Sequence, residues 1–112
     1  MKIYCESLTN ITIPDSVTSI GNYAFYACEQ TEQVEIAETV TLLGEKCFSN
    51  CELLREIIIP DGVKSIPLFA FNDCANMEYI SVPSTVTSFE QGCFDGCSSL
   101  IYFIVPDGTT TI

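Results

Sequence analysis

The sequence predicts a mainly β solenoid, a right-handed coil with a parallel β-sheet on one face and short strands and helical turns on the other. Two observations point to this fold class. Five cysteines recur every 23 residues, at Cys5, Cys28, Cys51, Cys74 and Cys97. Counted from that cysteine as position 0, eight positions carry apolar residues in nearly every copy. A fixed period without insertions is typical of stacked repeats, in which each coil contacts only its neighbours.

Each repeat contains one alternating segment that begins five residues after the cysteine, with positions 6 and 8 directed inward. The expected strands are residues 10–13, 33–36, 56–59, 79–82 and 102–105. A proline follows four of them, and because proline has no N–H for a neighbouring strand, we expect the ladder to end there. Equivalent strands of successive repeats must then run parallel, about 4.8 Å apart.

The second half of each repeat predicts the opposite side of the coil. Pro-Asp-Ser and Pro-Asp-Gly indicate tight turns after the strand. Segments such as residues 16–20 then place positions 12 and 15 inward, and the Ala-Phe or Cys-Phe pair predicts a short helical turn. If the copies are stacked, Phe25, Phe48, Phe71 and Phe94 lie above one another in the core.

This repeat resembles the BspA-like subfamily of leucine-rich repeats, whose unit has the spacing C-x2-L-x2-I-x-L-P-x2-V-x2-I-x3-A-F-x2. The segment from Cys51 to Asp73 fits that spacing throughout, with aliphatic residues at its apolar positions. The resemblance extends from Cys5 to Ile112 and implies a leucine-rich-repeat solenoid. We therefore expect residues 1–112 to form a single leucine-rich-repeat domain whose last repeat is incomplete.

The departures from this pattern are Thr31 for leucine, Ala37 for proline, and Cys47 and Cys93 for alanine. Thr31 is expected to be the weakest position of the core, because a buried hydroxyl needs a hydrogen-bond partner. On this basis Thr31→Leu should stabilise the protein.

The resemblance also implies a function. Such repeats form cell-surface or secreted arrays in bacteria and some parasitic protists, where they adhere to host proteins or other cells, and their units carry no catalytic motif. The expected function is a non-catalytic protein-interaction or adhesion module at the cell surface or outside the cell. The alternative is a structural spacer or a fibre unit that stacks head to tail, because neither end shows a polar capping motif.

Composition excludes several other functions. Fifteen acidic and 4 basic residues give a net charge of -11, which disfavours nucleic acid and anionic membranes as partners. Apolar runs are far shorter than the ~20 residues that span a bilayer, and residues 1–10 lack the apolar stretch of a signal peptide. Without histidine, the chain has no constellation for nucleophilic catalysis, and we expect no enzyme activity and no cofactor.

The seven cysteines occupy two core columns, with Cys47 and Cys93 in the second. Stacked residues have parallel Cβ vectors about 4.8 Å apart, which exceeds the ~3.8 Å of a relaxed disulfide. We therefore expect buried free thiols and equal melting of reduced and oxidised protein. Two C-x3-C pairs suggest zinc, but they lie roughly 10 Å apart with no histidine to complete either pair.

Carboxylates also form columns, namely Glu6, Glu29 and Glu52 at position 1 and Asp15, Glu38 and Asp61 at position 10. Such columns could bind calcium, or act as a glycosidase pair. We prefer turn and surface roles, because aspartate favours turns and an uninterrupted coil provides no catalytic cleft. No metal site is expected.

The outward positions of the strands, 5 and 7, differ most between repeats. Polar and acidic residues occupy the first copies, and tyrosine and isoleucine the later ones, a composition typical of contact surfaces. The predicted protein-binding residues are Glu35, Glu56, Ile58, Tyr79, Ser81, Tyr102 and Ile104. The alternative is that β-branched and aromatic residues occur there only because strands favour them.

Overall fold

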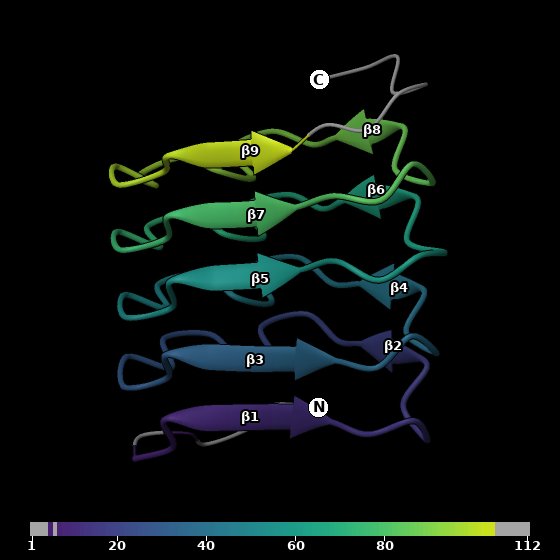
Figure 1. Ribbon diagram of the computed structural model, residues 1–112, viewed down its shortest axis with the longest axis horizontal. Coiled ribbons are helices and arrows are strands. Elements are labelled where there is room, and N and C mark those ends of the chain that lie inside the picture. Colours follow the sequence, from purple (N-terminus) through teal and green to yellow (C-terminus); the bar gives the residue numbers. More distant parts are fainter. Residues whose placement is uncertain (1–4, 6, 105–112) are drawn as a thin grey trace.

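The computed structural model describes residues 5 and 7–104, and of Tyr102–Ile104 only the main chain. The described part is a coil of stacked repeats with a parallel five-stranded sheet on one face (Figure 1). This sheet has the order β1-β3-β5-β7-β9, so that every second strand in the sequence is a neighbour. Its strands are β1 (Asn10–Ile13), β3 (Gln33–Ile36), β5 (Glu56–Ile58), β7 (Tyr79–Ser81) and β9 (Tyr102–Ile104). The predicted fold class is confirmed, and the expected strands agree to within one residue.

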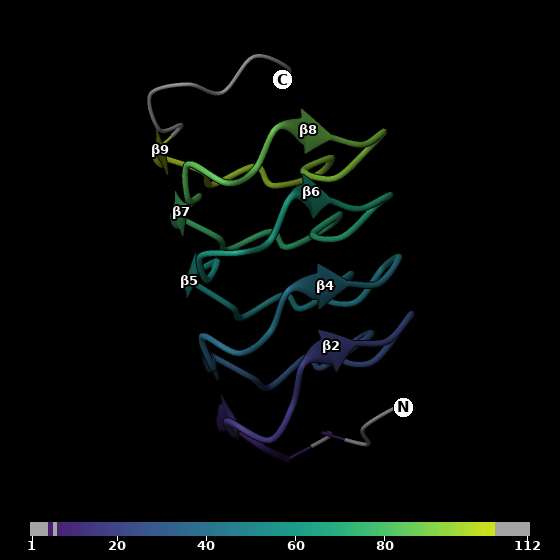
Figure 2. The same ribbon diagram turned by 90° about the vertical axis from the view of Figure 1, so that its right-hand side faces the viewer.

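Four two-residue strands lie on an adjoining side of the coil (Figure 2). These strands are β2 (Ser19–Ile20), β4 (Leu42–Leu43), β6 (Ser65–Ile66) and β8 (Ser88–Phe89). They pair in parallel as β2 with β4 and β6 with β8. The tight turn predicted between the two kinds of strand is present, since the N–H of Val17 donates to the carbonyl of Pro14 at 3.0 Å. In the third repeat Gly62 has a φ of 101°, a conformation that favours glycine.

Consecutive turns, rather than the expected helical turn, follow the short strands, and the described residues contain no helix. Two positions in each of these loops have a left-handed main chain, for example Tyr23 and Ala27, with φ of 60° and 56°. This conformation directs N–H groups along the axis of the coil. Those of Tyr23 and Ala27 donate to the carbonyls of Glu45 and Ser49 in the next repeat, at 2.9 and 2.8 Å. The loops therefore hydrogen-bond into a second ladder, which a regular helix would prevent.

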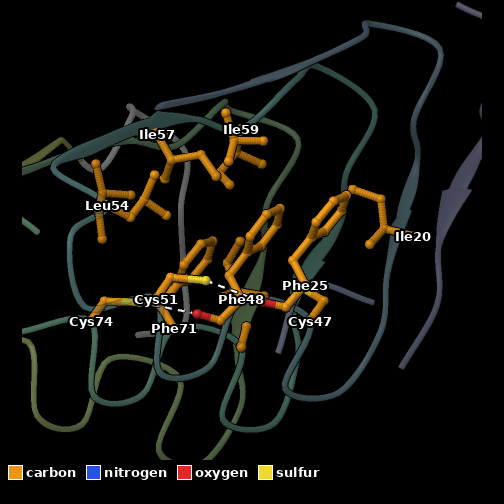
Figure 3. Packing of buried hydrophobic residues seen from close by; sticks show 14 of the residues in the cluster. Ile20, Phe25, Cys47, Phe48, Cys51, Leu54, Ile57, Ile59, Phe71 and Cys74 are labelled. Atoms are coloured by element: carbon orange, nitrogen blue, oxygen red, sulfur yellow. Dashed lines mark hydrogen bonds between the residues drawn. The ribbon is translucent and has the colours of Figure 1, made fainter. Parts of the chain in front are cut away.

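The four phenylalanines of the core stack in one column, as the repeat pattern predicts. Successive ring centroids from Phe25 through Phe48 and Phe71 to Phe94 are 5.2, 5.5 and 5.8 Å apart, and the rings are within 9° of parallel. Figure 3 shows three of these rings side by side beneath the inward residues of the strands. The core is thus one continuous apolar column of the kind expected of repeat proteins.

Thr31 is fully buried, and its hydroxyl donates to the carbonyl of Leu8 in the preceding repeat at 2.9 Å. The hydroxyl therefore has the partner that a buried polar group requires. Among the described residues, no buried side-chain nitrogen or oxygen lacks a hydrogen-bond partner. Thr31→Leu would remove a satisfied hydroxyl rather than an unpaired one, so the expected stabilisation loses its physical basis.

The prediction that the cysteines are free thiols is wrong for the first pair. Cys5 and Cys28 form a disulfide, with their Cα atoms 5.3 Å apart. That separation lies within the usual range for disulfides, so stacking in adjacent repeats does not by itself prevent a bond. The other five cysteines are free. In the later repeats, free thiols of the same column make hydrogen bonds to the main chain. The Sγ–H groups of Cys51 and Cys74 donate to the carbonyls of Phe25 and Phe48, as Figure 3 shows.

Candidate functional site

The outward face of the five-stranded sheet is the candidate site, and the strands position its side chains by simple alternation. In β5, Ile57 is 1% exposed, whereas its neighbours Glu56 and Ile58 face solvent, Ile58 with 65% of its surface exposed. Glu35 is exposed in the same way between the inward residues of β3. Glu35, Glu56 and Ile58 therefore point away from the core.

Register brings the predicted residues of neighbouring strands together. Glu56 lies beside Tyr79, and Ile58 lies beside Ser81. Tyr79 and Ser81 are half-buried. The side chains of Tyr102 and Ile104 lie outside the described part of the structure, although their main chain pairs with Tyr79 and Ser81. The structure thus describes five of the seven predicted side chains as one outward face.

A hollow of about 680 Å³ lies over the ends of β1, β3 and β5. Predicted residues Glu35, Glu56 and Ile58 line it, together with Asp15 and Glu38 from the turns that follow the strands. These last two were considered above only as members of an acidic column. The signal that could have included them is their place at position 10, three residues after the outward position 7 of their strands.

A second hollow, of about 510 Å³, lies at the opposite ends of these strands and extends to the start of β7. Its lining residues are Thr9, Asn10, Glu32, Gln33, Arg55, Glu56, Glu78 and Tyr79. Glu56 therefore borders both hollows. Together they extend along the face and include four of the predicted residues, Glu35, Glu56, Ile58 and Tyr79.

The sheet is least regular between β3 and β5, beneath the larger hollow. Registered pairing there is limited to Gln33 with Glu56, whereas β1 and β3 pair at four positions and β5 and β7 at three. The two arrows are visibly farther apart than other neighbours in Figure 1. Ile36 at the end of β3 is only half-buried, whereas the equivalent Ile13 and Ile59 are buried. The irregularity coincides with Ala37, which replaces the proline found at this position in the other three repeats whose strand end is described.

Negative charge dominates the face. The two hollows are lined by six carboxylates, from Asp15, Glu32, Glu35, Glu38, Glu56 and Glu78. Their one cationic neighbour in the lining, Arg55, lies 3.7 Å from Glu78, and the two side chains are 64% and 45% exposed. An exposed pair of this kind contributes little, so Arg55 neutralises only one edge of the face.

Burial also governs the chemistry of the free cysteines in the described part of the chain. Burial raises the pKa of the Cys47 and Cys51 thiols to about 12, which keeps them protonated and unreactive near neutral pH. No group of three or more cysteine, aspartate or glutamate side chains able to hold a metal ion occurs in the part of the chain that is described. Within residues 7–104, no helix could cross a membrane.

Comparisons with known proteins identify the repeat. The family model of the BspA type leucine rich repeat region matches residues 3–112 as 6 copies. A leucine-rich repeat protein of T. pallidum has a similar structure, with a TM-score of 0.81 and 33% sequence identity over 92% of this chain and 46% of its own. Comparison with curated proteins gives no match.

Two further crystal structures have the same fold. A leucine-rich repeat protein from Bacteroides ovatus ATCC 8483 gives a TM-score of 0.78 at 20% identity, covering 96% of this chain and 30% of the other. A leucine rich cell surface protein from Faecalibacterium prausnitzii A2-165 gives 0.62 at 26% identity, covering 82% and 30%. This chain therefore spans less than half the length of each of the three proteins.

Proposed function

Because the chain belongs to the BspA-type leucine-rich repeat family, we propose that it is a protein-binding module of the adhesion type that contacts its partner through the outward face of the five-stranded sheet. Leucine-rich repeats commonly mediate protein–protein interaction, and the fold is typically non-catalytic. The proposed contact residues are Glu35, Glu56, Ile58, Tyr79, Ser81, Tyr102 and Ile104.

The observation that carries this proposal is the exposure of Ile58 in the middle of a hollowed sheet. An aliphatic side chain with 65% of its surface exposed, beside Ser81 on the next strand and two residues from Glu56 on its own strand, has the apolar centre and polar surroundings of a contact site. Strand preference accounts for isoleucine in β5, but it does not account for the hollow that Ile58 lines or for the second hollow near the other ends of the strands.

We further propose a location at the cell surface or outside the cell. One of the similar structures is a cell surface protein, and the disulfide between Cys5 and Cys28 requires an oxidising compartment to form and persist. The partner is then a protein that is itself extracellular.

The test is a binding screen against a panel of purified extracellular proteins, followed by two matched variants. Ile58→Ala removes most of the aliphatic side chain at the centre of the face without changing its charge. Leu42→Ala does the same on β4, on another side of the coil, where leucine is 66% exposed. We expect Ile58→Ala to weaken binding by about tenfold or more and Leu42→Ala to leave it unchanged, because only a central contact residue carries a large share of binding energy.

Equal effects of the two variants, or no binder that depends on Ile58, would count against the proposed function. Circular dichroism melts of both variants establish that the fold is retained. If light scattering instead shows concentration-dependent growth of assemblies by the protein alone, and no panel protein binds, the alternative of a self-associating spacer is favoured.

A further inference from the structure

We propose that the larger hollow, over β1, β3 and β5, binds a lysine- or arginine-rich segment of the protein partner. This inference rests on the proposed function and adds the chemistry of the partner. It depends on three observations, namely the charge of the lining, its apolar walls and the interrupted pairing of the sheet beneath it.

The charge of the hollow has one sign. Asp15, Glu35, Glu38 and Glu56 line it, and no lysine or arginine is among its lining residues. Three of the four lie on β3, β5 or the turn directly after β3, so their charges face a shared space. Carboxylates in a recess attract cationic groups more strongly than the same charges on an open surface, because the low-dielectric walls concentrate the field.

The walls between the carboxylates are apolar. Pro14, Ile36, Ala37 and Ile58 contribute accessible aliphatic surface to the same hollow. Lysine and arginine combine a hydrocarbon stem with a charged head, and they bury the stem along apolar surface while the head reaches polar groups. A surface of aliphatic walls and carboxylates is complementary to these two side chains in both parts.

The interrupted pairing between β3 and β5 sets the place of the hollow. Strands β3 and β5 pair in register only at Gln33 and Glu56. Beyond that pair, the side chain of Ile36 is half-buried rather than buried. Side chains of a partner can therefore approach between two strands, whereas the closely paired β5 and β7 present a continuous surface. Nucleic acid is disfavoured as an occupant by the same carboxylates that favour a basic protein segment.

The test uses a fluorescein-labelled octalysine peptide as probe, with octaglutamate as the negative control, and measures fluorescence anisotropy at two ionic strengths. The decisive comparison is between two triple variants with the same change in net charge. Glu35→Gln, Glu38→Gln and Glu56→Gln remove carboxylates of the hollow. Glu29→Gln, Glu45→Gln and Glu52→Gln remove exposed carboxylates that line neither hollow.

We expect the hollow variant to weaken octalysine binding by about tenfold and the control variant by less than about twofold, with both effects smaller at high salt. Equal weakening would mean that the peptide binds to the overall negative charge, which overturns the inference. Loss of self-association on removal of the hollow carboxylates, without an effect on the peptide, would assign the face to a second copy and overturn it as well.

The outcome is distinguishable from failure of the proposed function. If the binding of a panel protein depends on Ile58 but not on the three glutamates, the proposed interaction role is supported and the proposal of a basic segment is overturned. If the binding of a panel protein depends on Ile58 and on the three glutamates, and weakens as the salt concentration rises, both proposals are supported.

Discussion

Thr31 shows how one residue can depart from the repeat pattern and still have its buried hydroxyl satisfied. Leucine or methionine fills the equivalent buried position in later repeats, as Leu54 and Met77 do. Threonine is smaller, and its hydroxyl would be costly to bury alone. The hydrogen bond to the Leu8 carbonyl, across one repeat, removes that cost and links the first two coils of the described structure.

We therefore expect Thr31→Val to destabilise the protein by about 1 kcal/mol, because it keeps the shape of the side chain and leaves the Leu8 carbonyl without its donor. Urea unfolding followed by circular dichroism measures the change. The matched control is Thr39→Val, whose hydroxyl donates to the Val17 carbonyl at 2.7 Å in an exposed position where water can replace it. A gain in stability for Thr31→Val would show that the bond to Leu8 contributes nothing.

At the scale of the structural elements, the repeat pattern predicted the strands well and the loops poorly. Alternation and the following prolines identify the strands because both act locally on the strand itself. The left-handed positions of the loops are occupied by residues such as Tyr23, Lys46 and Phe69, which carry no glycine signal. Their conformation follows from hydrogen bonds to the next repeat, as with the N–H of Phe69 and the carbonyl of Gln91 at 3.1 Å.

The same elements stabilise each other through side chains that the pattern does not reveal. Lys46 lies between the rings of Tyr23 and Phe69 in the adjacent loops, with its Nζ 5.5 and 5.6 Å from their centroids. Such cation–π contacts are each of the order of 0.5–1 kcal/mol at exposed sites. The loops are therefore held together by contacts between repeats rather than by structure within one repeat.

The disulfide between Cys5 and Cys28 covalently joins the first two coils. Cys5 and Cys28 close a loop with a sequence separation of 23. A cross-link over a loop of this length stabilises by about 3 kcal/mol, chiefly by restricting the unfolded chain. We expect a reductant to lower the melting temperature by several degrees, in contrast to the equal melting expected from the sequence.

The double variant Cys5→Ser with Cys28→Ser provides the control, because the reductant should not change its melting temperature further. Mass spectrometry after alkylation of the folded protein counts the thiols that remain. If the natural protein melts alike with and without the reductant, the disulfide does not stabilise the array.

At the scale of the whole molecule, the sequence predicted the stacking of the repeats but only part of the candidate site. Which residues face outward follows from period 2, so Glu35, Glu56 and Ile58 could be identified. The hollow could not, because it depends on how closely β3 and β5 approach and on the turn residues Asp15 and Glu38. Ala37 in place of proline is a local departure at this position, but the sequence of one repeat does not state how closely its strand approaches the next.

The thiols of the stack link the stability of the whole array to pH. Cys47 is fully buried, and desolvation is the main cause that raises the pKa of its thiol from 9.0 to about 12. Between these two values the unfolded chain releases a proton that the folded protein retains. The free energy of unfolding therefore falls as the pH rises above 9, whereas the contribution is fully present below it.

Cys47→Ala isolates this effect, because alanine already occupies the same core position as Ala24 and Ala70. At pH 7 the variant should have a lower free energy of unfolding only because the packing contacts of the sulfur atom are lost. One pH unit above 9, the natural protein loses roughly 1 kcal/mol that the variant does not, so the difference between them should shrink by that amount. Val40→Ala, equally buried and without a titrating group, should show the same loss at both pH values in urea unfolding. A constant difference for Cys47→Ala as well would mean that the buried thiol ionises as readily in the folded array as in the unfolded chain.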